Sequence, residues 1–376
     1  MAILPSSDFD SRLWAWLRHG LAEQASDLHL VAGYPPTLRI HGTLRGIDEA
    51  ALSGELIADT VRGIMPVELR EKVSGRKDYD FSTSILDGEQ LHRFRVNVFH
   101  SQEAVGACFR FIPGQIPSFD WMGVPAELPR RIINLHNGLV LITGVTGSGK
   151  TTTLAGLVEL MNQQGDRRIV TIEEPVEYLF KPTGRSVITQ REVGVDVDSF
   201  ADGLKYSLRQ DPDVILCGEV RDMDTARMAI SAAETGHLVL STVHTQDAKG
   251  AITRLIDIFP PERQQDIRGQ LSLSLRFVVS QHLLPHVTAG EKRVLATEVL
   301  VVNDAARAAI RLNKTESIDT VIQTGKRSGM QTLDESLAAL VISRKISPKT
   351  AHRFAKNPQG LRALGVPEVA VDQFAL

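Results

Sequence analysis

Cysteine, long apolar runs and blocks of like charge are all scarce in this sequence. Only two of its 376 residues are cysteines, Cys108 and Cys217, and both stand among apolar neighbours. A disulfide framework or a zinc site of about four ligands needs more partners than these two can provide. We therefore interpret both cysteines as small, buried hydrophobic residues.

Apolar runs are also short. None of them approaches the ~18 residues that a membrane span requires. The opening MAILPSSDFD has no basic segment followed by an apolar one, so it does not read as a signal peptide. We expect a soluble, cytoplasmic protein with no direct membrane insertion.

Charge is nearly balanced, with 42 Lys and Arg against 45 Asp and Glu and a net charge of −3. No long basic tract is present, so nucleic acid is not expected as a partner. Hydrophobic residues make up 43% of the chain, which allows a core of ordinary size. The length allows two domains.

The first part of the sequence, residues 1–113, has the pattern of a small α+β domain. Apolar residues spaced four apart predict an amphipathic helix over 7–24. Alternation of apolar and polar residues, typical of an antiparallel sheet with one buried face, predicts strands. The predicted strands cover 27–31, 37–40, 92–99 and 107–112.

The pattern changes after a segment rich in turn-forming residues, 114–118, which we interpret as a linker. In the following region, 119–376, short and nearly continuous apolar runs predict the buried parallel strands of an α/β sheet. These runs lie at 139–143, 168–172, 214–217 and 238–243. From about residue 260 we expect mostly helices, over 261–285, 303–312, 331–343 and 348–356.

The run GVTGSGKT fits the pattern of a phosphate-binding loop, G-x-x-x-x-G-K-[ST]. Its glycines allow backbone N–H groups to point at phosphate oxygens, and the helix that follows adds its positive end. Lys150 would reach the β- and γ-phosphates of ATP, and Thr151 would offer its hydroxyl to Mg²⁺. A predicted strand before the run and a predicted helix after it distinguish this loop from a chance glycine-rich turn. The predicted binding residues are Gly144, Val145, Thr146, Gly147, Ser148, Gly149, Lys150, Thr151 and Thr152.

Acidic residues follow two of the predicted parallel strands. Glu219 comes just after the strand at 214–217, where its carboxylate could hold the water shell of Mg²⁺ or orient the attacking water. Glu173, Glu174 and Glu177 follow the strand at 168–172. They could serve as base and metal shell, or they could form an ordinary acidic loop.

Two histidines bracket the predicted strand at 238–243. His244, at its carboxyl end, could sense the γ-phosphate, because ligands gather at the carboxyl ends of parallel strands. His237, at the other end, fits a hydrogen-bonded core histidine equally well. We do not expect this pair to bind a metal.

Taken in order, the phosphate-binding loop and three further motifs resemble those of the secretion ATPases of type II and type IV pilus systems. The three motifs are TIEEPVEY, DPDVILCGEVRD and TGHLVLSTVHT. The likeness is strongest to the PilT family of pilus retraction motors and covers nearly the whole chain. It implies a small PAS-like α+β domain, then a RecA-like P-loop ATPase domain with a helical C-terminal extension.

The resemblance also implies an assembly and a task. The expected assembly is a homo-hexamer with one nucleotide site per interface, peripheral to the inner membrane through a pilus or secretion platform protein. The expected task is Mg²⁺-dependent ATP hydrolysis that powers pilus retraction and twitching motility. An ATP-binding assembly subunit with little turnover and a nucleic-acid translocase are alternatives, which assays of phosphate release and of stimulation by DNA would separate.

Individual residues take their roles from the same resemblance. Arg93, Arg95 and Arg110 align with arginines that the family presents toward a nucleotide. Their alternating positions place them on one sheet face, and a solvated face is the alternative interpretation. Arg209, just before the strand at 214–217, is a further candidate. The expected catalytic residues are Glu219, Glu177, Lys150, His244, Arg93, Arg95 and Arg110, and the expected Mg²⁺ contacts are Thr151 and Glu219.

The sequence departs from the PilT pattern at two places. Glu174 stands where the family usually has aspartate. The family's AIRNLIRE-type motif appears at 305–312, where Arg307, Ile310 and Arg311 remain but the other polar and acidic positions do not. A PilU-like accessory protein or a secretion-system assembly ATPase is therefore an alternative to a retraction motor. Two cysteines cannot build the four-cysteine zinc module of the extension ATPases, which argues against an extension motor.

Overall fold

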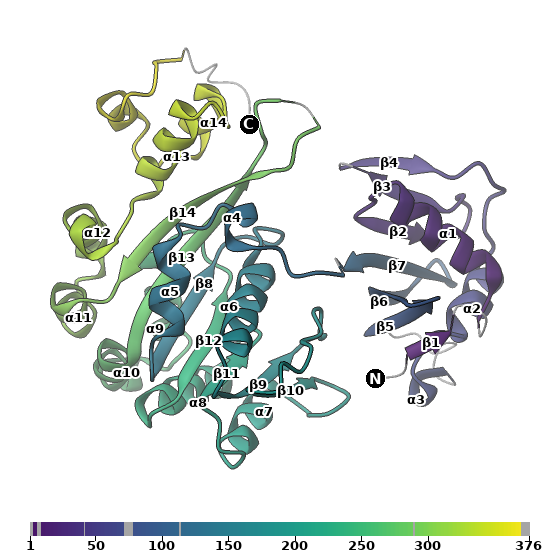
Figure 1. Cartoon of the computed structure of the whole chain (residues 1–376), viewed down its shortest axis with the longest axis horizontal. Helices are drawn as coiled ribbons and strands as arrows, with labels where there is room; N and C mark the ends of the chain where they lie inside the picture. Colours follow the sequence, from purple (N-terminus) through teal and green to yellow (C-terminus); the bar gives the residue numbers. More distant parts are fainter. Residues whose placement is uncertain are drawn as a thin grey trace. The chain divides into compact units, whose positions relative to one another are not determined.

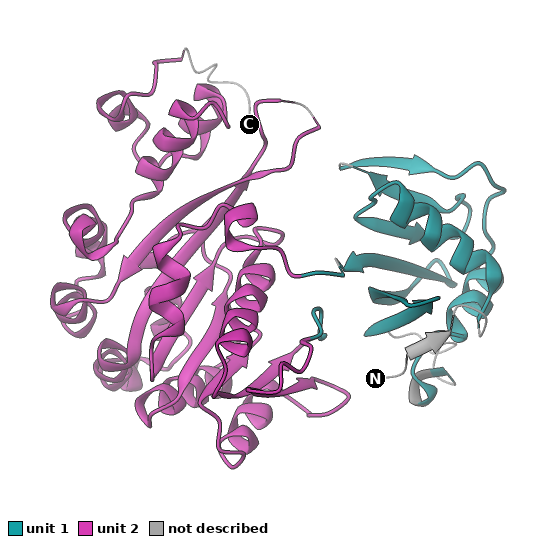
Figure 2. Cartoon of the chain, viewed as in Figure 1, with its two compact units in different colours: residues 1–115, 175–179 teal, residues 116–174, 180–376 magenta. Residues whose placement is uncertain are grey.

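The computed structural model describes residues 3–5, 9–40, 42–70, 78–112, 114–288 and 290–369. It divides the chain into two compact units (Figure 2). Unit 1 comprises residues 1–115 and 175–179, and unit 2 comprises 116–174 and 180–376. Residues 175–179 therefore interrupt unit 2 in the sequence and belong to unit 1. The linker predicted at 114–118 stays a prediction.

Unit 1 is built on a seven-stranded sheet. Its first two strands in space, β1 and β5, pair in parallel, and all its other pairs are antiparallel. In spatial order the strands are β1 (Ile3–Pro5), β5 (Tyr79–Asp87), β6 (Gln90–Ser101), β7 (Ala104–Ile112), β2 (Asp27–Leu30), β3 (Thr37–Ile40) and β4 (Thr43–Gly46).

Helices cover one face of this sheet. The helices of unit 1 are α1 (Ser11–Ala22), α2 (Gly54–Arg62) and α3 (Val67–Arg70). Leu13 and Leu17 of α1 pack into the same buried cluster as Phe94 and Phe109 of the sheet. The helix predicted over 7–24 begins later, at Ser11, because the Asp10 side chain accepts the N–H of Arg12 and caps it.

The other face of the unit 1 sheet is polar. Arg93, Arg95 and Asn97 alternate along β6 with the buried Phe94 and Val96, as the period of two predicts. Cys108 lies on this polar face, opposite Asn97 of β6. It is only half-buried, so the prediction of a buried cysteine was wrong there, whereas Cys217 in unit 2 is buried as predicted.

Unit 2 is built on a second seven-stranded sheet, parallel except for its last pair (Figure 1). In spatial order the strands are β10 (Val187–Glu192), β9 (Arg168–Glu173), β11 (Val214–Cys217), β12 (Leu238–Val243), β8 (Gly138–Thr143), β13 (Leu275–Leu284) and β14 (Val294–Val301). The predicted α/β fold class is confirmed, and the four predicted parallel strands correspond to β8, β9, β11 and β12.

Both faces of this sheet are buried under helices. Leu139 and Leu141 of β8 pack in the cluster that includes α8, α9 and α10, and Val140 and Ile142 pack in the cluster with α5 and α6. The helices up to this point are α4 (Phe119–Met122), α5 (Glu127–Ile133), α6 (Lys150–Gln164), α7 (Phe200–Ser207), α8 (Met223–Glu234), α9 (Ala248–Asp257) and α10 (Pro261–Ser274). Burial on both faces explains why these strands read as continuous apolar runs.

The region after residue 260 contains more strand than we predicted. The helix expected over 261–285 ends at Ser274, and the rest of it is β13; the apolar segment that follows is β14. A short apolar run is compatible with a buried helix or with a buried strand. Here the run forms a strand, β13, because it pairs with β8. The C-terminal helical elements are α11 (Asp304–Arg311), η1 (Thr315–Ser317), α12 (Ile318–Thr324), η2 (Lys326–Ser328), α13 (Leu333–Ile342), α14 (Pro348–Phe354) and η3 (Pro358–Leu364).

Within the described residues, no helix has the length and apolar character needed to cross a membrane.

Candidate functional site

The loop between β8 and α6 has the conformation that phosphate binding requires. Gly144, Gly147 and Gly149 all have positive φ values, of 143°, 77° and 89°. A Cβ atom at Gly144 would lie 2.4 Å from Ser148 Oγ and 2.5 Å from the carbonyl oxygen of Gln281, so only glycine fits there. The 15-residue helix α6 follows directly, and no side chain caps its first turn. Its first N–H groups therefore remain available for an anion.

Lys150 is folded back into the loop. Its Nζ donates hydrogen bonds to the carbonyl oxygens of Gly144 at 2.9 Å and of Val145 at 3.1 Å. The side chain is buried, and burial lowers the pKa of its ammonium group. The loop thus holds a positive charge on carbonyl oxygens that phosphate oxygens could replace.

The remaining loop residues differ in exposure. Val145, Thr146 and Gly147 are exposed at the tip, and Ser148 is buried beneath them. Thr151 is exposed in the first turn of α6, and Thr152 is half-buried. A ligand approaching the loop would therefore meet its tip and the Thr151 hydroxyl.

Two further predicted residues lie at the same edge of the sheet. Strands β8, β12 and β11 are adjacent and parallel, so their carboxyl ends share one edge. His244 follows β12, Glu219 follows β11, and His244 Nε2 lies 3.0 Å from Glu219 Oε2. The pKa of His244 is lowered by burial and by the charges of Lys150 and Arg221, and each of these favours the neutral imidazole. Because the charge of Lys150 affects the pKa of His244, this histidine lies close to the loop.

Arg221 is a member of this group that sequence reasoning did not single out. Its guanidinium forms an ion pair with Glu219, and its Nη1 lies 3.5 Å from Glu174 Oε2. The Glu219 side chain is only 12% exposed, and its two carboxylate oxygens lie next to Arg221 and His244. The sequence signal that could have identified Arg221 is its position two residues after Glu219, within the motif DPDVILCGEVRD.

Gln281 of β13 is a second residue that sequence reasoning missed. It is fully buried, and its Nε2 donates to Thr153 Oγ1 in α6 at 2.7 Å. We did not identify Gln281 from the sequence because it lies in a segment that we predicted to be helical.

His237 and Arg209 are not at this edge. His237 precedes β12, at its amino end, and its Nδ1 lies 3.1 Å from the carbonyl oxygen of Ala232. Arg209 is exposed and precedes the amino end of β11. The structure therefore separates both residues from the loop by the length of a strand within unit 2.

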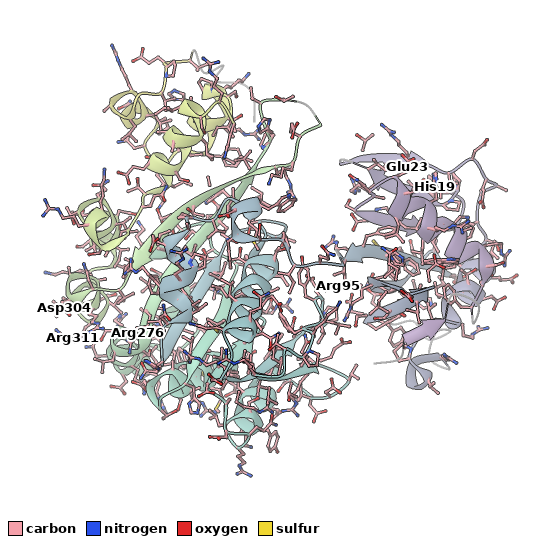
Figure 3. All side chains as sticks on the ribbon, viewed as in Figure 1. His19, Glu23, Arg95, Arg276, Asp304 and Arg311 are labelled. Atoms are coloured by element: carbon pink, nitrogen blue, oxygen red, sulfur yellow. The ribbon has the colours of Figure 1, made fainter. Side chains whose placement is uncertain are left out.

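The three predicted arginines of unit 1 share one sheet face. Arg95 and Arg110 are cross-strand partners on β6 and β7, and Arg93 lies two residues before Arg95. Arg110 Nε donates to Asp27 Oδ1 at 3.0 Å, and Arg95 Nε lies 3.9 Å from Asp80 Oδ1. Figure 3 labels Arg95 on this sheet. The predicted common face is present.

Glu177 lies with these arginines inside unit 1. Burial raises the pKa of its carboxyl, and the charges of Arg95, Arg110 and Arg93 act in the opposite direction. Arg93 itself is 5% exposed, and its Nη2 donates to the carbonyl oxygen of Val176 at 2.5 Å. The charges of all three guanidinium groups thus act on Glu177, and two of these groups also pair with Asp27 and Asp80.

No group of three or more His, Cys, Asp and Glu side chains in the described ranges is arranged to hold a metal ion by itself. This donor set does fit an ion such as Mg²⁺, which proteins usually bind through one or two groups together with substrate phosphates. The Thr151 hydroxyl and the Glu219 carboxylate are two oxygen donors at this edge.

A curled, glycine-shaped loop between a buried parallel strand and a helix, with a lysine inside it, defines a P-loop nucleotide-binding protein. Residues 14–370 match the model of the family described as type II/IV secretion system protein. The chain belongs to this family of ATPases, as a PilT-like member that hydrolyses ATP.

Three relatives illustrate the likeness. The type IV pilus retractation ATPase PilT of Pseudomonas aeruginosa is 40% identical over 335 residues, which cover 89% of this chain and 95% of that protein. The type IV pilus ATPase PilU of the same organism is 35% identical, with 93% and 90% covered. The crystal structure of the pilus retraction motor PilT with bound ADP superposes with a TM-score of 0.82 at 38% identity, covering 92% of this chain and 98% of that one.

Proposed function

We propose that this chain is the subunit of a homo-hexameric motor that hydrolyses ATP to power type IV pilus retraction. The observation that carries the proposal is the match to PilT over 95% of that relative's length, which includes both the loop-bearing unit and the smaller unit. The motor would work at the cytoplasmic side of the inner membrane and act on a platform protein there. We do not propose nucleic acid as a binding partner of this motor.

A PilU-like accessory role, or service as a secretion-system assembly ATPase, is the second candidate. PilU is 35% identical over most of both chains. The segment at 305–312 also lacks part of the retraction motif. A bacterium without its own retraction ATPase would separate the two: this chain alone should restore pilus shortening as a retraction motor, whereas an accessory subunit would not.

The proposed site begins with the loop. Lys150 would leave the carbonyl oxygens of Gly144 and Val145 and bind the β- and γ-phosphates, while the loop N–H groups bind the remaining oxygens. Thr151, with Glu219 nearby, would hold Mg²⁺, which supplies positive charge to the phosphates. Glu219, fixed by Arg221 and His244, would orient the attacking water.

We assign Glu177 and the arginines of unit 1 a supporting role. Arg95 and Arg110 would stabilise the negative charge that develops on the transferring phosphoryl group, and Glu177 would hold them in place. Arg93 is buried and donates to a main-chain carbonyl, so it would position the segment at 175–179.

Replacing Glu219 by glutamine should separate hydrolysis from binding. We expect kcat to fall by about 10²-fold, because a positioned base contributes about that much, while affinity for ADP changes less than about twofold. Phosphate release and fluorescent-ADP titration measure the two quantities. Glu234→Gln, at the exposed end of α8, is the matched control. Loss of ADP affinity in parallel with turnover would show that Glu219 acts in binding.

A further inference from the structure

An open surface cavity of about 600 Å³ in unit 2 lies away from the P-loop. Its lining includes Arg130, Arg131, Arg276 and Phe277, and one acidic residue, Glu127. Arg276 lies near the amino end of β13, which runs parallel to β8, and the P-loop follows the carboxyl end of β8. The six residues of β8, at ~3.3 Å each, put roughly 20 Å between the cavity and the loop.

A distortion of the sheet places Arg276 in this cavity. The register between β13 and β8 shifts between Leu275 and Phe277, so Arg276 is the extra residue of a β-bulge. Bulges re-aim side chains and mark functional positions. Gly138, with φ of 111°, makes room for it: a Cβ there would lie 2.4 Å from Arg276 Cγ and 2.8 Å from its Nε. The bulge in β13 and the space left by Gly138 together determine where the Arg276 side chain lies.

Arg131 is seated in the same way. Its guanidinium carbon lies 5.3 Å from the centre of the Phe277 ring. Its Nη1 donates to the carbonyl oxygen of Ser328 at 2.5 Å. A Cβ at Gly329, whose φ is 78°, would lie 2.4 Å from Arg131 Nη1. The Phe277 ring and the Ser328 carbonyl oxygen therefore position this guanidinium, and Gly329 leaves room for its end.

The charges of these two arginines are not neutralised. Arg276 donates to Asn137 Oδ1 at 3.0 Å and to the carbonyl oxygen of Leu273 at 2.5 Å, and these acceptors, like that of Arg131, are uncharged. Neither arginine forms an ion pair with a carboxylate in the described ranges. By contrast, Arg130 lies 3.6 Å from Glu127. Each guanidinium has five N–H donors, and the bonds above leave several of them unused.

Further positive charge lies close by. The pKa of Arg276 is lowered by burial and by the charge of Arg307, which belongs to α11. Arg307 Nε is buried without a hydrogen-bond partner in the described structure. Figure 3 labels Arg276 on the same flank of unit 2 as Asp304 and Arg311, the two ends of α11. Arg307 Nη1 lies 3.6 Å from the exposed Asp304 Oδ1, so its charge is partly balanced, and a bound anion would mainly offset the charges of Arg131 and Arg276.

We propose that this cavity binds a phosphate group, at a site separate from the ATP site. The one carboxylate of the lining, Glu127, pairs with Arg130, which leaves the guanidinium groups of Arg131 and Arg276 without an ion pair. Two such groups match the charge of one phosphate dianion, and the arginine fork matches its oxygens. The cavity has the size of a small-ligand site, and the Phe277 ring and Val301 add an apolar wall. The phosphate could belong to a soluble ester or to a phospholipid head group.

The test uses the purified full-length Lys150→Ala chain, so that binding at the P-loop does not mask the second site. Calorimetric titration with pyrophosphate probes the soluble source, and co-sedimentation with phosphatidylglycerol vesicles probes the lipid source. We expect one of these probes to bind, and Arg131→Gln with Arg276→Gln to weaken that binding at least about tenfold. Arg227→Gln, an exposed residue paired with Asp224 on α8, should change nothing.

One more variant separates the site from a purely structural role. Arg276→Lys keeps the charge without the fork, should fold as the parent does, and should bind several-fold more weakly. Equal binding by parent and double variant, no binding of either probe, or binding only of a glutamate-rich peptide would overturn the proposal.

Discussion

Replacing Lys150 by alanine should lower ATP turnover by about 10³-fold. The ammonium group is buried inside the loop, where it donates hydrogen bonds to the carbonyl oxygens of Gly144 and Val145. The phosphate groups of ATP would replace these acceptors. Loss of one preorganised donor to a developing negative charge costs about 10²–10³ in kcat, and this lysine also contributes to binding. Phosphate release at saturating ATP measures the effect, and fluorescent-ADP titration measures the loss of affinity.

Two controls sharpen this experiment. Lys314→Ala removes an exposed lysine of the same unit and should leave turnover unchanged. Lys150→Arg keeps the charge, but the larger side chain has no room in a site where lysine is only 8% exposed, so it should be inactive as well. A Lys150→Ala chain that hydrolysed ATP at the parent's rate would remove this loop from the mechanism.

The parts of the site that could be predicted from sequence are those set by local chemistry. The glycines at 144, 147 and 149 are needed because each adopts a positive φ, and that need is visible in the residues themselves. The strands before Lys150, Glu219 and His244 are short apolar runs because both faces of the sheet are covered. Their shared carboxyl edge follows from parallel pairing alone.

The parts that could not be predicted depend on which distant segments meet. Nothing near Leu275 shows that this apolar run pairs with β8 rather than continuing α10, so β13 and the buried Gln281 were missed. The pairing of Arg221 with Glu219 depends on side-chain directions after the strand end. Alternation predicted that Arg93 and Arg95 share a face, but not that Arg93 is buried and donates to Val176.

An ionic cluster around the buried Glu298 ties the C-terminal part of unit 2 to its sheet. Lys356 follows α14, and its Nζ lies 2.7 Å from Glu298 Oε2 on β14, 3.2 Å from Asp247 Oδ2 and 3.2 Å from Asp319 Oδ1. Glu298 is 2% exposed, and one of its oxygens also accepts the N–H of Ala248 at the start of α9. Asp334 accepts the main-chain N–H of Lys356. One ammonium group therefore balances carboxylates from three elements.

Lys356→Met should lower the free energy of unfolding by about 3–5 kcal/mol. The change leaves the buried Glu298 carboxylate without its counter-charge, and breaking a buried pair in this way is strongly destabilising. Urea unfolding followed by circular dichroism measures the change. Lys249→Met is a control of similar exposure, 31% against 32% for Lys356. Its main partner, Glu316 at 3.0 Å, is 86% exposed, and it approaches one member of the cluster, Asp319, only at 4.0 Å. There the loss should stay below about 1 kcal/mol.

The pH dependence of this difference gives a second check. Burial alone would lower the pKa of Lys356, but Glu298, Asp247 and Asp319 outweigh it and raise the pKa above its ordinary value. A raised folded-state pKa gives stability that is fully present below the unfolded-state value of about 10.4 and is lost only as pH rises through the folded-state value. Burial raises the pKa of Glu298, so the variant, which lacks the ammonium group, loses stability if this carboxyl ionises as pH rises. The gap between parent and Lys356→Met should therefore not narrow between pH 7 and pH 9. A gap that narrows within this window would mean that Lys356 is not the charged centre of the cluster.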